Sequence, residues 1–244
     1  MIGFLISALK IIILLGFLVL IHEGGHFLVA KLFKIKVNEF AIGFGPTIFT
    51  KEKGETRYAL RLITLGGFVN MEGEEERSKS QGSFSEASIP KRIAIVAAGG
   101  LVNIIFGILI YYIISSITFN SMYTGIISTK DFVLSIFESI KLLFTGNISV
   151  NQMTGIVGIS DIVVSTNGIM QYLYIMALIS VSLGITNLLP FPPLDGGKIL
   201  IYIIEWVRRK PMKEETELKL QTLGFSILIV LSIYVTYNDI TRIF

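Results

Sequence analysis

The sequence contains no cysteine, only two histidines and few charged residues. Without cysteine the protein has no disulfide, iron–sulfur cluster or thiolate metal site. Charged residues make up 16% of the 244 positions and hydrophobic residues 52%, whereas about a quarter of a soluble domain is charged. One water-soluble core cannot contain so much apolar surface, so we expect a protein that is embedded in a lipid bilayer.

The positive charges lie beside the apolar runs. The net charge is +3 and the isoelectric point about 9.0, which raises the question of nucleic-acid binding. No basic face with interleaved aromatic residues is present, however, and the observed distribution is typical of membrane topology. We therefore expect the lipid bilayer, and no nucleic acid, among the partners.

Four apolar stretches, at about residues 2–33, 93–119, 169–189 and 220–237, approach or exceed the roughly 20 residues that a transmembrane helix needs. The first is longer than one crossing, so we expect Met1–Lys10 to lie at the interface or the helix to tilt. It has no early basic region and a polar motif interrupts it. These features favour a retained span over a cleaved signal peptide.

Lysine and arginine indicate the direction of the spans. Residues 31–92 hold eleven of the 21 basic residues and residues 208–219 hold five, whereas residues 119–169 hold only two. By the positive-inside rule, the two basic loops are cytoplasmic and both termini face outward. We expect a multi-pass protein of the cytoplasmic (inner) membrane.

The regions between the spans have patterns of their own. Residues 36–71 are rich in β-forming residues around a turn at Glu52–Glu55, and their apolar segments Gly43–Pro46 and Leu65–Phe68 predict a membrane-associated β-hairpin. Residues 72–88, acidic and rich in serine, are predicted to be a mobile linker. Residues 131–144 place Phe132, Ile136, Ile140 and Leu143 on one face, which predicts an amphipathic helix on the outer membrane surface.

The predicted fold class is an all-α polytopic membrane protein with four transmembrane helices and a β-hairpin after the first span. We expect residues 1–244 to form a single membrane-embedded domain.

Both histidines belong to the segment His22–His26, which matches the pattern HExxH. Helix positions four residues apart lie on one face, so both imidazoles can bind one zinc ion. Zinc lowers the pKa of a bound water to about 7, and Glu23 can accept its proton and pass it to the leaving amine. Alternatively, two interfacial histidines cap a span beside a glutamate that extends to water. Polar groups inside an apolar helix are costly and usually functional, which argues against that alternative.

Catalytic zinc usually has three protein ligands. Without cysteine or a third histidine, the third ligand must be Asp or Glu. Asp195 is the best candidate, because it follows the third span near its cytoplasmic end, at a depth similar to that of His22 and His26. The alternative is that Asp195-Gly196-Gly197 only forms a turn. Gly24 and Gly25 are poor helix formers, which suggests that a neighbour or substrate passes close to them.

The HExxH segment and Asn187–Gly197, which reads N-x-x-P-x-P-x-L-D-G, together resemble the site-2 protease family of intramembrane zinc metalloproteases. The similarity is greater to its bacterial branch, the regulator-of-sigma-E proteases. Gly43–Pro46 and Gly66–Val69 resemble the membrane-associated hairpin of that branch, while residues 83–103 and Thr145–Ile159 resemble the stretches that precede its second and third spans.

The resemblance implies a bacterial protease that cleaves transmembrane segments of membrane proteins, such as anti-sigma factors or signal-peptide remnants. It implies that Zn²⁺ is held by His22, His26 and Asp195 and that Glu23 is the catalytic base. Asn187, Pro190 and Pro192 match positions that hold substrate near the metal. Asn187 alone is equally well explained as a helix cap, and the prolines as the end of the third span.

Two features depart from the branch. Gly100 stands where proline is common in its A-G-P-x-x-N pattern, which leaves the packing of the second span open. The roughly 50 residues between the second and third spans are too few for a PDZ domain of about 80–100 residues, so we expect none.

Two other functions use the same residues. A zinc transporter or metal-sensing membrane protein would need the ligands, and an inactive scaffold would bind transmembrane helices. Neither role needs a base at Glu23, which argues against both.

Overall fold

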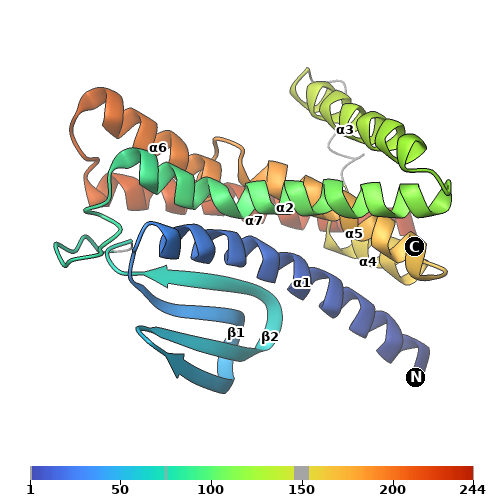
Figure 1. Ribbon diagram of the computed structural model, residues 1–244, viewed down its shortest axis with the longest axis horizontal. Helices are drawn as coiled ribbons and strands as arrows, with labels where there is room; N and C mark the ends of the chain where they lie inside the picture. The colour runs from blue at the N-terminus through green and yellow to red at the C-terminus, as the bar shows by residue number, and fades with distance from the viewer. Residues whose placement is uncertain (1, 75, 146–153, 244) are drawn as a thin grey trace. The chain divides into compact units, whose positions relative to one another are not determined.

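The computed structural model describes residues 2–74, 76–145 and 154–243. Helices predominate, and one small antiparallel sheet follows the first helix (Figure 1). In chain order the elements are α1 (Ile2–Leu32), β1 (Val37–Lys53), β2 (Thr56–Met71), α2 (Ile89–Thr118), α3 (Met122–Phe144), α4 (Ile156–Val164), α5 (Ile169–Asn187), α6 (Asp195–Arg208) and α7 (Glu214–Ile243).

Within the described residues, four helices are long and apolar enough to cross a membrane. They comprise Ala8–Leu32 of α1, all of α2 and α5, and Glu214–Arg242 of α7. Each coincides with one of the four predicted stretches, so the prediction of four candidate spans is confirmed. The first of them belongs to a continuous helix that begins at Ile2, and the expectation that Met1–Lys10 lies at the interface or that the helix tilts stays a prediction. The seventh helix is longer than predicted at both ends.

Helices α4 and α6 were not predicted as elements. Each is too short to cross a bilayer, with 9 and 14 residues, so a search for long apolar runs overlooks both. Helix α3 contains the predicted amphipathic stretch and begins nine residues earlier, at Met122. Phe132 is buried there and its ring stacks on Tyr111 at 4.0 Å. Residues 146–153, part of the stretch that resembles the segment before the third span, lie outside the described residues.

The predicted hairpin is present, but both of its strands are bent. The first part of β1, Val37–Ile42, pairs with the end of β2 at Gly67–Met71 and also with the beginning of β2 at Arg57–Leu60. Gly43 and Gly45 have φ angles of +91° and +81° at the bend of β1, a region that favours glycine. The segment Gly43–Pro46 therefore lies at this bend, and the turn between the strands is at Gly54–Glu55.

The loop between β2 and α2 is tied to its surroundings, in contrast to the predicted mobile linker. Phe84 is buried, and its backbone N–H donates to Glu72. The Glu72 carboxylate accepts hydrogen bonds from Asn38 and Ser80. Hydrogen bonds from Asn38 and from the serines of the loop hold the pKa of Glu72 below its usual range.

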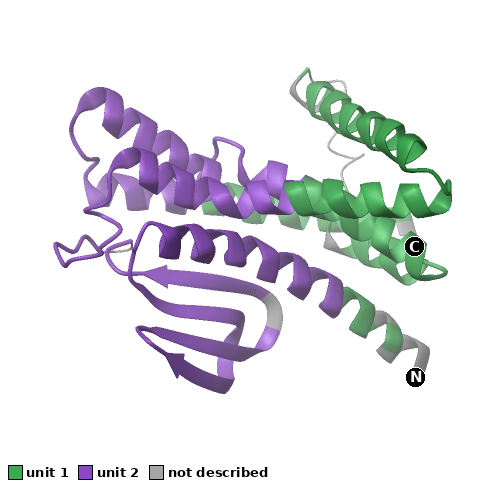
Figure 2. Cartoon of the chain, in the orientation of Figure 1, with its two compact units in different colours: residues 1–11, 105–181, 225–244 green, residues 12–104, 182–224 purple. Residues whose placement is uncertain are grey.

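The chain divides into two compact units (Figure 2). One comprises residues 12–104 and 182–224 and contains the sheet, α6 and the buried cluster around Val37, Ile95 and Tyr202. Every residue of the predicted zinc site belongs to this unit.

The other unit comprises residues 1–11, 105–181 and 225–244. Its buried carboxylate, Asp239, accepts hydrogen bonds from the N–H groups of Gly155 and Gly158 at 2.9 and 2.8 Å. It also pairs with Arg242. Asp239 thereby satisfies donors at the beginning of α4, as a capping side chain does.

Candidate metal centre

The two histidines of α1 lie one helical turn apart and face the same point. The Nε2 atoms of His22 and His26 are 3.2 Å apart, and both rings are buried. The i and i+4 spacing of the HExxH pattern therefore brings both nitrogens together, as predicted.

Asp195 approaches this pair from the first residue of α6. Its Oδ2 atom lies 3.1 Å from Nε2 of His22 and 3.3 Å from Nε2 of His26. Burial raises the pKa of Asp195, but the two imidazoles beside it more than compensate and leave the pKa below its usual range. The side chain is thus held in the ionised form that a metal ligand needs.

The loop that precedes Asp195 is closely packed on itself. A β-carbon at Gly196 would collide with the carbonyls of Leu188 and Leu189, and one at Gly197 would lie 2.6 Å from the nitrogen of Pro192. Proline cannot continue α5, and only glycine fits after Asp195. The segment Asp195-Gly196-Gly197 is therefore the beginning of a helix and not a mere turn.

The three side chains fit a zinc ion. Their ligand atoms all lie within 4.8 Å of one another. A tetrahedral zinc with bonds of 2.0–2.1 Å separates its ligand atoms by about 3.3 Å, close to the three separations given above. Two histidines with one carboxylate also form a donor set that catalytic zinc uses.

A second layer of groups orients the histidines. Nδ1 of His26 donates to the backbone carbonyl of Ile95 at 2.8 Å, which leaves Nε2 free to bind metal. Nδ1 of His22 lies 3.4 Å from the side-chain amide of Asn103, a fully buried residue of α2. The amide atom nearest to Nδ1 is Nδ2; rotating the amide by 180° places Oδ1 there instead, where it would accept the hydrogen of Nδ1 and leave Nε2 of His22 free as well.

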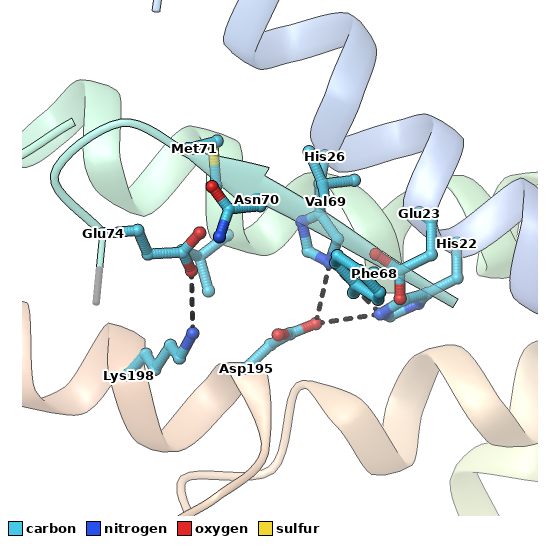
Figure 3. A pocket seen from close by; sticks show the side chains of 11 residues that line it. His22, Glu23, His26, Phe68, Val69, Asn70, Met71, Glu74, Asp195 and Lys198 are labelled. Atoms are coloured by element: carbon cyan, nitrogen blue, oxygen red, sulfur yellow. Dashed lines mark hydrogen bonds and ion pairs between the residues drawn. The ribbon is translucent and has the colours of Figure 1, made fainter. Parts of the chain in front are cut away.

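Glu23 lies beside the histidines and lines a cavity of about 280 Å³ with them and Asp195. Figure 3 shows its carboxylate next to His22, on the side that faces this cavity. The rest of the lining comes from the last strand segment of β2, the loop after it, α2 and α6; it comprises Phe68, Val69, Asn70, Met71, Glu74, Val96 and Lys198.

An ion pair crosses the side of this cavity. Nζ of Lys198, one helical turn after Asp195, lies 2.8 Å from Oε1 of Glu74 (Figure 3). Burial lowers the pKa of Lys198, but Glu74 more than compensates and raises it above its usual range. The lysine stays charged at neutral pH and ties α6 to the loop after β2.

Paired glycines allow α1 and α2 to approach closely at the site. A β-carbon on Gly25 would lie 2.7 Å from the carbonyl oxygen of Ala98, and one on Gly99 would collide with the ring of His26. The expectation of a close neighbour is therefore confirmed for Gly25. At Gly24 a β-carbon would meet nothing within 4 Å, so no neighbour within the protein explains this glycine, and the passage of a substrate there stays a prediction.

Gly100 packs against α5. A β-carbon there would lie 2.8 Å from the carbonyl oxygen of Gly184 and 2.7 Å from the side chain of Leu188. Glycine, at the position where the branch that the sequence resembles commonly has proline, is thus accompanied by a close approach of the two helices at this point.

The three predicted substrate-binding residues do not line the cavity. Asn187 is the last residue of α5, and Pro190 and Pro192 follow it in the loop that leads to Asp195. Of residues 187–195, only Asp195 lines the cavity. Their role in substrate binding stays a prediction.

The sequence profile of peptidase family M50 matches residues 10–231 of the chain. The chain belongs to peptidase family M50. It is similar to candidate zinc metalloproteases of three bacteria. That of Clostridium acetobutylicum is 26% identical over 94% of this chain and 96% of the relative. That of Fusobacterium nucleatum is 25% identical over 96% of this chain and 98% of the relative. That of Clostridium perfringens is 29% identical over 91% of this chain and 95% of the relative.

The first of these alignments extends over 324 residues, more than the 244 residues of this M50 peptidase. That relative therefore has internal segments that this chain lacks. Family and relatives, with the His-His-Asp group, identify the protein as a zinc metallopeptidase of the membrane.

Several residues of the M50 site had no predicted role in the sequence. Lys198 could have been found from its position three residues after Asp195, had α6 been recognised as a helix. Asn103 belongs to a segment that resembles the family, but its contact with His22 joins residues 81 positions apart. Glu74 and Asn70 reach the cavity through the bent sheet, and no local pattern indicates this.

Proposed function

We propose that this M50 peptidase is an intramembrane endopeptidase that cleaves transmembrane segments of other membrane proteins. One observation carries the proposal: the HExxH ligands belong to a helix that is apolar enough to span a bilayer, and Asp195 meets them there. A water-dependent site within a transmembrane helix is costly unless it acts on substrates of the same environment.

We assign zinc ligation to His22, His26 and Asp195, whose ligand atoms converge. Bound zinc supplies Lewis acidity, which activates water and polarises a peptide carbonyl. Glu23, beside His22 in the same cavity, holds the proton taken from water and passes it to the leaving amine. Ile95 and Asn103 keep the two imidazoles in the orientation that this chemistry needs.

The substrate must be extended before it can be cleaved, because a helix hides its peptide bonds in its own hydrogen bonds. Within the described residues, the segment Gly67–Met71 of β2 pairs only with β1, and it also lines the cavity. We infer that its other edge accepts the unwound substrate as an added strand. Asn187, with Pro190 and Pro192, would hold freed backbone groups on the opposite side; no hydrogen bond of the Asn187 side chain is found among the described residues.

The bend of the sheet supports the proposed association with the membrane. Phe44, Ile48, Phe49, Leu62 and Ile63 are all at least 49% exposed. Such a group of exposed apolar side chains marks a membrane or protein contact. We place this bend in the lipid, next to the spans.

The distribution of lysine and arginine supports a location in the cytoplasmic membrane with both termini outside. In this orientation, cleavage releases fragments towards the cytosol. Anti-sigma factors and signal-peptide remnants are the substrates that we propose, in regulated intramembrane proteolysis.

A cleavage assay with purified enzyme in liposomes tests the proposed function. A single-span substrate with a helix-destabilising sequence near its cytoplasmic end should be cleaved, and Glu23→Gln should abolish cleavage while zinc content stays near one ion per chain. His22→Ala should lose both zinc and activity. Equal cleavage by Glu23→Gln would contradict the role of Glu23, and zinc flux that survives this substitution would support a transporter instead.

A further inference from the structure

A second cavity lies away from the metal centre and shares no lining residue with it. Its volume is about 490 Å³. It is bounded by the loop after β2, the beginning of α2 at Ile89 and Arg92, and the end of α6 with the residues that follow. The candidate span α2 begins at this cavity, and the candidate span α7 begins at Glu214, which contacts Arg77 of the lining. We therefore expect the cavity to lie at the level of a membrane surface.

The cavity is basic. Five basic and two acidic side chains line it, so that three positive charges remain. The basic residues are Arg77, Lys79, Arg92, Arg209 and Lys210, and the acidic residues are Glu86 and Glu205. Near its rim, Glu214 lies 3.8 Å from Arg77. The basic residues come from three segments that are distant in the sequence, so the fold gathers their charge.

The buried carboxylate of Glu205 fixes part of this lining. It is 4% exposed and accepts hydrogen bonds from Arg77, Arg92 and the backbone N–H of Met212. This carboxylate is therefore satisfied and does not neutralise the remaining cations. Among the residues that the structure describes, the exposed side chains of Lys79, Arg209 and Lys210 have no ion pair.

Apolar surface adjoins the unpaired cations. Trp206, the only tryptophan, also lines the cavity and is 62% exposed, and the neighbouring Val207 is 76% exposed. Tryptophan is enriched where a membrane protein meets the headgroup region. Basic pockets beside spans on the cytoplasmic side bind anionic lipid headgroups.

We propose that this cavity binds the phosphate headgroup of an anionic phospholipid. Lys79, Arg209 and Lys210 contact the phosphate, while Trp206 and Val207 lie against the glycerol and the first acyl carbons. Bound lipid joins α6, which begins with the zinc ligand Asp195, to the beginning of α2. The proposal depends on the membrane location of the protein and not on its proteolytic activity.

Lipid binding to the purified full chain in a neutral detergent tests the proposal. Phosphatidylglycerol or phosphatidylcholine is added, and retained lipid is counted by native mass spectrometry. We expect phosphatidylglycerol to bind at least about tenfold more tightly. The triple variant K79Q/R209Q/K210Q should lose about 100-fold of this affinity, because each of the three basic residues near a lipid surface contributes about fivefold.

The matched control removes the same charge from the sheet. Lys51, Lys53 and Arg57 are exposed and lie around the hairpin turn, so K51Q/K53Q/R57Q should bind phosphatidylglycerol as the parent does. The charge-retaining variant K79R/R209K/K210R should also keep binding. Equal loss in the cavity and control variants would overturn the proposal, as would inorganic phosphate or glycerol phosphate competing at the concentration of the lipid.

Discussion

At the scale of single residues, the proposed zinc site depends on the groups that contact the Nδ1 atoms of its two histidines. His26 is oriented by a backbone carbonyl that no side-chain substitution removes, whereas His22 depends on Asn103. Groups in this outer layer affect metal affinity nearly as much as the ligands, because they fix the tautomer of the imidazole. Asn103 is therefore the residue at which this layer can be tested.

Asn103→Leu should weaken zinc binding by about 10–100-fold, because Nδ1–H of His22 then has no acceptor in the protein interior. Asn103→Asp retains an acceptor oxygen of the same shape and should keep most of the affinity. Competition with a chromogenic chelator measures both. Ser115→Ala, which removes another buried polar group of α2, should leave zinc affinity unchanged, and a loss equal to that of Asn103→Leu would argue against an orienting role.

The three residues of the proposed zinc site can be predicted from the sequence, but their surroundings cannot. His22 and His26 follow from helical periodicity alone, and the absence of cysteine restricts the third ligand to a carboxylate. Its depth beside the third span favours Asp195, and the structure places its Oδ2 atom 3.1 Å from Nε2 of His22. Glu74 and Asn103 reach the site by long-range packing, which leaves no local pattern in the sequence.

At the scale of elements, the approach of α1 and α2 determines where the histidines sit. Gly25 and Gly99 remove the side chains that would separate the two helices. Small residues allow such close backbone approach in membrane helices. The neighbouring Gly24 has no such contact. Replacing Gly24 or Gly25 with alanine should therefore have different effects on thermal stability.

Gly24→Ala should leave the melting temperature unchanged or raise it, because alanine stabilises a helix by about 1 kcal/mol relative to glycine. Gly25→Ala should lower it by several degrees, since its β-carbon would lie 2.7 Å from the carbonyl of Ala98 and overpacking costs about 1–3 kcal/mol. Thermal unfolding of both variants in the same detergent decides the question. Similar effects of the two substitutions would contradict the close contact at Gly25.

Hydropathy predicts the long helices because a bilayer demands about 20 consecutive apolar residues. The same criterion does not detect α6, because this helix has only 14 residues and they include an aspartate, a lysine, a glutamate and an arginine. It also cannot reveal that β1 and β2 bend, since the bend depends on which strand segments pair. The sequence thus predicts the spans and the hairpin, and tertiary pairing supplies the arrangement that encloses the site.

At the scale of the whole molecule, the distribution of charge predicts the orientation in the membrane. The sheet, α6 and both cavities belong to residues that flank or include the two basic loops. Helix α3, in contrast, follows the second span in a region with only two lysines. If the positive-inside rule holds, these two sets of residues are on opposite sides of the membrane.

The chain has no cysteine, so single introduced cysteines can report this orientation without background. Lys53 and Lys130 are both exposed and lie in the hairpin and in α3. In intact cells a membrane-impermeant maleimide should label Lys130→Cys but not Lys53→Cys, and permeabilised cells should show labelling of both. The cysteine-free parent should remain unlabelled in each case. The reverse pattern would place the loop after the first span outside, and fragments of a cleaved substrate would then leave on the opposite side from the one we propose.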